Sequence, residues 1–249
     1  GGGTIWNLVA NPFPSYIHGN TNADSSNNFL TVNTDKLHDS YEAIYGYDAD
    51  GSGYTAYNNT SSALNLAPGQ AFMVASDNTS SDNISFTTDM RTIVGGDDLI
   101  VGDILEDTFE LIIKLYDGDT ELDYTKFYFA DGLSLGLDPG YDAGNFNQGA
   151  SLMSRLVEED EGVGLVINAM GLESVNDVVV PLEINRESGN SFRISIDTFD
   201  IYAGTNVYLE DNVQGTMTLL NEQDFELTPE NNLSGVGRFF IHLTETTFS

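Results

Sequence analysis

The chain has no cysteine and few basic residues: eight lysines and arginines stand against thirty-nine aspartates and glutamates. Without cysteine there is no disulfide framework and no thiol chemistry. The formal net charge is −31, and no lysine or arginine lies between Lys36 and Arg91. Nucleic acids, anionic lipids and charged polysaccharides are therefore repelled, unless a divalent cation bridges to them. The composition leaves a neutral ligand, a cation, or a role that needs only a soluble acidic surface.

Long hydrophobic runs are also missing, because no apolar stretch reaches the ~18 residues of a membrane span. We therefore expect no membrane insertion. The opening GGGTIW lacks the basic start and the apolar stretch of a secretory signal. An abundance of aspartate, asparagine, glycine, threonine and tyrosine is nevertheless typical of exported proteins. We expect a secreted or cell-surface protein, and a fragment of a longer parent with covalently linked neighbouring domains.

What the chain does contain is a series of short segments rich in β-branched and aromatic residues. Glycine, asparagine, aspartate or proline bounds each segment, and helical periodicity is nearly absent. This pattern predicts an all-β fold of the sandwich or barrel kind. The predicted strands are residues 4–9, 41–47, 53–57, 70–75, 83–87, 109–116, 124–129, 164–168, 178–184, 191–197, 206–210, 216–220 and 238–243. The run VVVPL at 178–182 predicts a central strand with a bulge near Pro181.

The sequence predicts a division of the chain at residues 93–98, IVGGDD, where paired glycines and charges separate two strand-rich halves. We therefore predict an N-terminal domain over residues 1–95 and a C-terminal domain over residues 96–249. Within the second half, the glycine- and aspartate-rich stretch 132–153 predicts a long loop. Loops of that length are uncommon unless they are functional or disordered.

Several stretches resemble a known family of regions. Residues 6–16 read WNLVANPFPSY, residues 45–48 YGYD, residues 67–74 APGQAFMV, residues 138–143 DPGYDA and residues 206–211 NVYLED. Together they resemble the region that precedes the type IX secretion sorting domain in large secreted proteins of marine Bacteroidetes, which include adhesins and polysaccharide-degrading enzymes. The resemblance covers nearly the whole chain, without the sorting domain itself. It implies two non-catalytic β-sandwich domains, Ig-like or jelly-roll, that hold polysaccharide or a cell surface.

One local motif, DADGS at residues 48–52, has alternating oxygen-bearing side chains. Asp48, Asp50 and the Ser52 hydroxyl could converge on a calcium ion, as in loops that deliver several oxygens to one point. The match is partial, because the acid expected at the twelfth position of an EF-type loop is Asn59. The alternative is a β-hairpin with Asp50 and Gly51 at its tip and no ion. Both interpretations remain open.

The aromatic residues around this motif are candidates for stacking on sugar rings, because tyrosine offers a flat apolar face with a polar tip. If the two flanking strands pair, alternation places Tyr45 and Tyr47 on one face with Tyr54 nearby. The full predicted platform is Trp6, Tyr16, Tyr45, Tyr47, Tyr54 and Tyr57. The alternative is that these rings stabilise the sheet as cross-strand pairs, and that Trp6 belongs to the core.

One motif favours an enzyme. Residues 222–226, EQDFE, resemble the catalytic E-x-D-x-E strand of jelly-roll endoglucanases and agarases. On a strand, Glu222, Asp224 and Glu226 would share one face, as a retaining glycoside hydrolase requires. Gln223 replaces the apolar residue expected there, and this half of the chain has no tryptophan to line a sugar cleft.

These observations favour a non-catalytic module that binds a neutral, marine-type polysaccharide, or a surface, by aromatic stacking, with calcium supporting the hairpin. A structural spacer next to a sorting domain is the main alternative. A glycoside hydrolase that uses Glu222 and Glu226 is the third.

Overall fold

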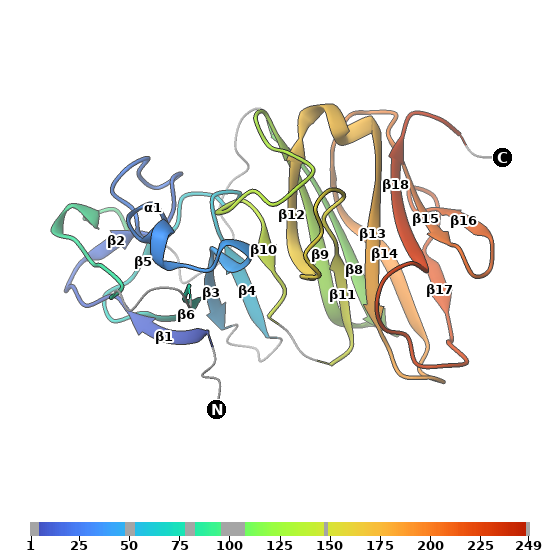
Figure 1. Ribbon diagram of the computed structural model, residues 1–249, viewed down its shortest axis with the longest axis horizontal. Helices are drawn as coiled ribbons and strands as arrows, with labels where there is room; N and C mark the ends of the chain where they lie inside the picture. The colour runs from blue at the N-terminus through green and yellow to red at the C-terminus, as the bar shows by residue number, and fades with distance from the viewer. Residues whose placement is uncertain (1–4, 48–52, 78–82, 96–107, 147–148, 248–249) are drawn as a thin grey trace. The chain divides into compact units, whose positions relative to one another are not determined.

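The computed structural model describes residues 5–47, 53–77, 83–95, 108–146 and 149–247, and most of its regular structure is β-strand (Figure 1). The chain forms two compact units. The first unit comprises Gly1–Glu106 and Asp138–Ala143, and the second unit comprises Asp107–Leu137 and Gly144–Ser249. The all-β prediction is confirmed. The assignment to two β-sandwiches and the domain limits at 95 and 96 stay predictions, because residues 96–107 lie outside the described ranges.

The first unit has two small antiparallel sheets, with strand orders β1-β6-β3-β4 and β5-β2-β7. Its elements are β1 (Trp6–Ala10), β2 (Tyr16–His18), α1 (Phe29–Asn33), β3 (Ile44–Tyr47), β4 (Tyr54–Tyr57), β5 (Asn65–Leu66), β6 (Ala71–Ala75) and β7 (Arg91–Thr92), with 3₁₀ turns at Thr34–Lys36, Asp39–Tyr41 and Thr88–Met90. Asn28 caps α1, since its side-chain oxygen accepts a hydrogen bond from Thr31 N at 2.9 Å. No helix in the described residues is both long and apolar enough to cross a membrane.

Buried asparagine side chains take over part of the backbone pairing in this unit. Asn11, 2% exposed, donates to the carbonyls of Ser15, Leu66 and Ala67 and accepts from Phe13 N. Those bonds explain the NPFPS and APGQ sequences as one folded corner rather than as a ligand site. These bonds satisfy backbone groups of the corner that the strand pairing leaves partly unmet.

The strand predicted at residues 83–87 is not formed, and another asparagine supplies the reason. Asn33 accepts a hydrogen bond from Ser85 N at 2.7 Å and donates to Ser85 O at 3.0 Å. The amide of Asn33 thus pairs with Ser85 as a neighbouring strand would, and residues 83–87 remain irregular. The strand predicted at 41–47 is also shorter, because its first residue closes a 3₁₀ turn.

The second unit is built on one long series of strands, in the order β16-β15-β18-β13-β11-β12-β9-β8-β14-β17. Its elements are β8 (Phe109–Asp117), β9 (Thr120–Ala130), β11 (Ser151–Ser154), β12 (Leu165–Gly171), β13 (Asp177–Asn185), β14 (Phe192–Asp200), β15 (Asn206–Asp211), β16 (Thr216–Leu219), β17 (Phe225–Leu227) and β18 (Phe239–Thr244), with a 3₁₀ turn at Leu172–Asn176. The two-residue strand β10 (Ala143–Gly144) lies where the chain returns from the first unit. β12 runs parallel to β9. The predicted loop 132–153 therefore contains two short strands.

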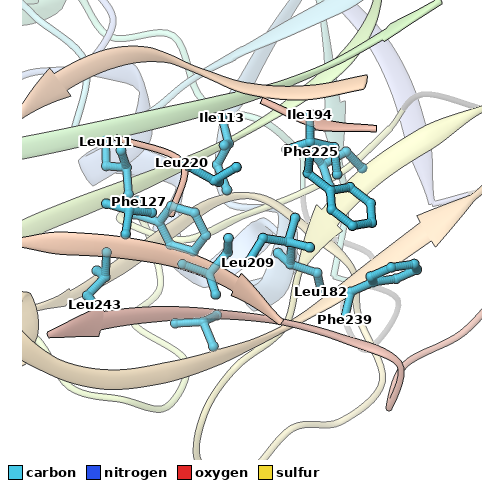
Figure 2. Packing of buried hydrophobic residues seen from close by; sticks show 14 of the residues in the cluster. Leu111, Ile113, Phe127, Leu182, Ile194, Leu209, Leu220, Phe225, Phe239 and Leu243 are labelled. Carbon is cyan, nitrogen blue, oxygen red and sulfur yellow. The ribbon is translucent and has the colours of Figure 1, made fainter. Parts of the chain in front are cut away.

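Side chains from strands far apart in this series meet in one apolar core (Figure 2). Phe127 of β9, Leu182 of β13 and Leu243 of β18 are at most 1% exposed. Phe225 of β17 lies with its ring centroid 6.0 Å from that of Phe239 of β18, although the two strands are distant in the strand order. The series therefore curls back on itself and encloses the core.

The predicted central strand at 178–184 is confirmed, but the bulge near Pro181 is not. The pairing of β13 with β18 runs from Asp177 to Leu182 without a register shift. Val179 is 44% exposed while Val180 is fully buried, so the triple valine alternates between solvent and core. An irregularity lies instead in β14, between Ile196 and Thr198.

Candidate functional site

The four-stranded sheet of the first unit has an inner and an outer face, which the strand register defines. On the inner face Val9, Ile44 and Phe72 pack into the apolar cluster, where the Phe72 ring meets that of Phe29 on α1 at 5.0 Å. Residues paired directly across strands point the same way, and neighbours in sequence point oppositely. The outer face is therefore formed by Trp6, Leu8, Ala10, Tyr45, Tyr47, Tyr54, Ala56, Ala71, Met73 and Ala75.

Two of the predicted tyrosines form an exposed pair on this outer face. Tyr47 and Tyr54 are direct partners of β3 and β4. Their ring centroids are 5.2 Å apart, and the rings meet edge to face at 69°. Tyr47 is 61% exposed and Tyr54 is half-buried. This contact with Tyr54 restricts the orientation of the exposed Tyr47 ring.

Tyr45 lies on the same face but is only 1% exposed. The Trp6 ring covers it, at 5.0 Å between centroids and 89° between planes, and Trp6 also meets Tyr41 at 5.3 Å. Tyr45 therefore presents no ring face to a ligand, which corrects the prediction for that residue. Trp6 is half-buried and acts mainly as the cover of this aromatic cluster.

Two further platform residues lie elsewhere. Tyr57 is three positions after Tyr54, so strand alternation turns it to the inner face, where it packs against the apolar cluster. Tyr16 belongs to β2 in the other sheet and pairs with Thr92 of β7. Neither residue joins the outer face, so the predicted platform is reduced to Tyr47, Tyr54 and the rim of Trp6.

The rest of the outer face is apolar, a feature that the tyrosine pattern did not reveal. Leu8 is 70% exposed, Ala10 and Ala71 are exposed, and Met73 is half-buried between Leu8 and Tyr45 in register. The outward positions of these strands include no charged residue, although the whole chain carries a net charge of −31. Such a patch is typical of a contact surface.

The calcium prediction at Asp48, Asp50 and Ser52 falls on residues outside the described ranges. Elsewhere, in the part of the chain that the structure does describe, no group of three or more histidine, aspartate or glutamate side chains could hold a metal ion. The hairpin itself is supported by the pairing of β3 with β4 from Ile44 to Tyr47. Whether it binds calcium stays a prediction.

Glu42, at the start of the segment leading into β3, is the most unusual ionisable residue of the first unit. It is 3% exposed; Oε1 accepts a hydrogen bond from Thr34 Oγ1 at 3.1 Å, and Oε2 is buried without a hydrogen-bond partner among the described residues. Burial raises the pKa of Glu42 from its usual 4.5 to about 7; the Thr34 hydrogen bond lowers it, and the Asp39 carboxylate raises it. The carboxyl therefore changes charge near neutral pH.

The segment 138–143 lies against Glu42 through a close backbone approach. Asn59 N donates to Gly140 O at 2.9 Å, and Asn58 Nδ2 donates to Tyr141 O at 2.6 Å. Gly140 has φ +79°, and a Cβ there would lie 2.9 Å from Asn59 Nδ2 and 3.3 Å from Glu42 Oε1. A side chain at this position would be strained and would crowd the amide. The DPGYDA stretch is thus a turn that is bonded to Asn58 and Asn59.

The three acids of the predicted catalytic strand do not all lie on a strand. Glu222 lies in a turn, where its backbone N–H donates to Leu219 O at 3.1 Å. Asp224 precedes β17 and forms an ion pair with Arg193 at 2.8 Å. Only Glu226 lies on the strand, opposite Arg193. The strand begins at Phe225, so Glu222 lies outside it. The glycoside hydrolase stays a prediction.

Comparison with known proteins identifies a family. Residues 3–243 match the model of a domain of unknown function (DUF8693), and the chain therefore belongs to that family. No curated protein matches the chain, and no solved structure matches it either.

Proposed function

We propose, for this member of the DUF8693 family, a non-catalytic module that binds neutral polysaccharide on the outer face of the β1-β6-β3-β4 sheet. The observation that carries the proposal is the exposed Tyr47 ring, which packs against Tyr54 within a face that has no charged outward residue. Sugar rings present flat C–H surfaces that pack on aromatic faces in the same way as other apolar groups.

The charge of the chain supports a neutral ligand. A net charge of −31 opposes uronic and sulfated polymers. Neutral glycans carry no such penalty, and they offer both apolar faces and hydroxyls. Leu8 and Met73 extend the contact area beside the tyrosine pair. The module would act as part of a secreted or cell-surface parent protein, and calcium bound by Asp48, Asp50 and Ser52 would rigidify the neighbouring hairpin.

Affinity electrophoresis in gels that contain agar, laminarin or xylan tests this proposal, with alginate and carrageenan gels as anionic counterparts. We expect retardation in at least one neutral gel. Tyr47→Ala should weaken that binding by about 1–3 kcal/mol, the usual effect of truncating an aromatic contact residue. Tyr202→Ala is the matched control, because Tyr202 is also exposed (43%) but lies in the second unit.

Runs with calcium and with a chelator test the metal separately, since the neutral-glycan proposal requires retardation in at least one of the two conditions. If no gel retards the protein in either condition, the binding proposal fails and the structural spacer becomes the better account. If Tyr202→Ala and Tyr47→Ala lose affinity equally, the outer face is not the site.

A further inference from the structure

A polar hollow of about 500 Å³ lies in the second unit, beside the loop that joins β13 to β14. That volume falls within the usual range of small-ligand sites. The hollow is lined by Gly149, Ala150, Asn185, Arg186, Glu187, Asn190, Asn232, Leu233 and Ser234. Apart from Leu233 and Ala150, its side chains are hydrogen-bonding groups.

The walls of the hollow are held in place by hydrogen bonds between two loops, the one that joins β13 to β14 and the one that precedes β18. The backbones of Arg186 and Leu233 exchange two hydrogen bonds, at 2.7 and 3.2 Å. Ser188 N donates to Asn232 Oδ1 at 2.9 Å, and Gly189 N donates to Pro229 O at 2.8 Å. The Asn232 side-chain oxygen is thereby engaged, which leaves its amide nitrogen as a donor. A prearranged wall lowers the entropy cost of binding.

Arg186 is the buried anchor of the hollow, with 8% exposure. Its Nη2 donates to Asp117 Oδ2 at 2.7 Å and to Ser191 O at 2.6 Å, and its Nε donates to Asn190 O at 3.3 Å. Its Nη1 makes no hydrogen bond within the described residues. The side chains of Glu187, Asn190 and Ser234 are likewise uncommitted in the described part of the chain.

The charge of the hollow selects its ligand. Asp117 compensates the Arg186 guanidinium, and Glu187 then leaves a negative balance. Anions are opposed by this balance and by the net charge of the chain. A cationic ligand is opposed as well, because it would lie next to the positively charged Arg186 guanidinium. The remaining class is a neutral molecule whose groups both donate and accept, because the hollow offers amides, a guanidinium, a carboxylate and a hydroxyl.

We propose that this hollow is a second saccharide site, which binds one or two sugar residues of a neutral glycan through their hydroxyls. Asn190, Asn232 and Arg186 donate, Glu187 accepts, and Leu233 contacts the apolar ring face. The site does not depend on the outer face of the first unit.

Titration of the isotope-labelled full chain with laminarihexaose, xylohexaose and cellohexaose, followed by amide NMR shifts, tests the proposal. At least one hexasaccharide should produce saturable shifts at residues 186–191 and 230–234. The double variant Asn190→Ala, Asn232→Ala should lower that affinity by about tenfold or more, since each lost donor leaves a sugar hydroxyl unpaired. Asn212→Ala, an exposed asparagine outside the hollow, should bind as the wild type does.

Glu187→Gln keeps the shape of the wall, so a loss of affinity in this variant is not caused by misfolding. It should lower the affinity less than the double variant does. Tyr47→Ala should leave these shifts unchanged, so the failure of this site is distinguishable from the failure of the outer face. The proposal is overturned if no hexasaccharide shifts the hollow amides, or if the double variant binds as tightly as the wild type. It is also overturned if alginate hexamers bind more tightly than the neutral probes, which would identify an anion site at Arg186.

Discussion

In the second unit, backbone N–H and C=O groups pair along a continuous series of strands from β16 to β17, and apolar side chains fill the space that the series encloses. In the first unit the sheets are small, and buried asparagines satisfy loop backbone that strands do not reach. The comparison shows two sources of order. Both units have an apolar core, but the first unit depends in addition on hydrogen bonds whose loss leaves buried groups unsatisfied.

A single tryptophan makes the two units separately observable. Trp6, the only tryptophan of the chain, lies in the first unit and packs against Tyr45. Its fluorescence reports unfolding of the first unit, whereas far-ultraviolet circular dichroism is dominated by the longer strands of the second unit. Variants that affect one signal more than the other therefore show which unit each side chain stabilises.

In the second unit the largest effect is expected for Phe127→Ala in the core. Phe127 is fully buried on β9. Removal of its ring should lower the free energy of unfolding by about 3–5 kcal/mol, because a cavity replaces a packed side chain. Denaturant unfolding followed by circular dichroism measures the loss, with Val213→Ala, which is 72% exposed, as the control. A loss under about 1 kcal/mol would contradict the importance of packing here.

Asn20→Ala should have a comparable but smaller effect, and only in the first unit. Asn20 is fully buried; it donates to the carbonyls of Asn58, Ser61 and Ser62 and accepts from Ala23 N and Leu64 N. We expect a loss of roughly 2–4 kcal/mol, because several buried groups lose their partner and water reaches only some of them. The Trp6 fluorescence transition measures it. If Asn212→Ala, at an exposed site, is equally destabilising, the explanation fails.

Glu42→Gln should stabilise the first unit at neutral and alkaline pH. The folded pKa of Glu42 is about 7 and its usual value is 4.5. The stabilising contribution of the protonated carboxyl is therefore complete below about pH 4.5 and is lost as the pH rises through 7. The free energy of unfolding of the variant should exceed that of the wild type by a margin that grows over this window to about 1–3 kcal/mol.

The pH series for Glu42→Gln is read from Trp6 fluorescence, with Glu222→Gln as the control at an exposed site. A difference that is constant between pH 4.5 and 8 would show that Glu42 does not titrate in that range. A difference that grows toward low pH would reverse the sign and contradict the burial of an unpaired carboxylate oxygen.

The smallest stability effect is expected for Tyr47→Ala, within about 0.5 kcal/mol, because the ring is 61% exposed. Tyr45→Ala is its counterpart on the same strand and face, and the loss of that buried ring should destabilise by about 3–5 kcal/mol. Both are measured by thermal unfolding. Equal effects of the two variants would mean that the rings are equally buried in solution.

Most strands could be predicted from the sequence, because alternating β-branched and aromatic residues between turn residues are a local signal. The long strands of the second unit, such as β13 and β18, follow that signal within a few residues. The short strands β2, β5 and β7 were missed, since two or three residues are too few to show a pattern. The strand at 83–87 was wrong because Asn33, fifty residues earlier in the chain, replaces its partner.

The candidate site was only partly predictable, for a related reason. Strand alternation correctly predicts that Tyr45 and Tyr47 share one face. It does not predict that Trp6 covers Tyr45 and leaves Tyr47 exposed. It also does not predict that Leu8 and Met73 flank the tyrosines. The sequence of β6, AFMVA, is apolar on both faces and does not show which face is exposed. The burial of Glu42 had no local signal at all, since glutamate is an ordinary surface residue.

The amino-acid sequence by itself determined the acidic charge, the absence of thiol chemistry and the all-β character, because composition and two-residue periodicity act locally. The exposure of the aromatic rings, the hydrogen bonds from buried asparagines to loop backbone and the burial of the Glu42 carboxyl follow from the tertiary structure alone. Those properties depend on contacts between residues that are distant in the chain, and no local pattern specifies them.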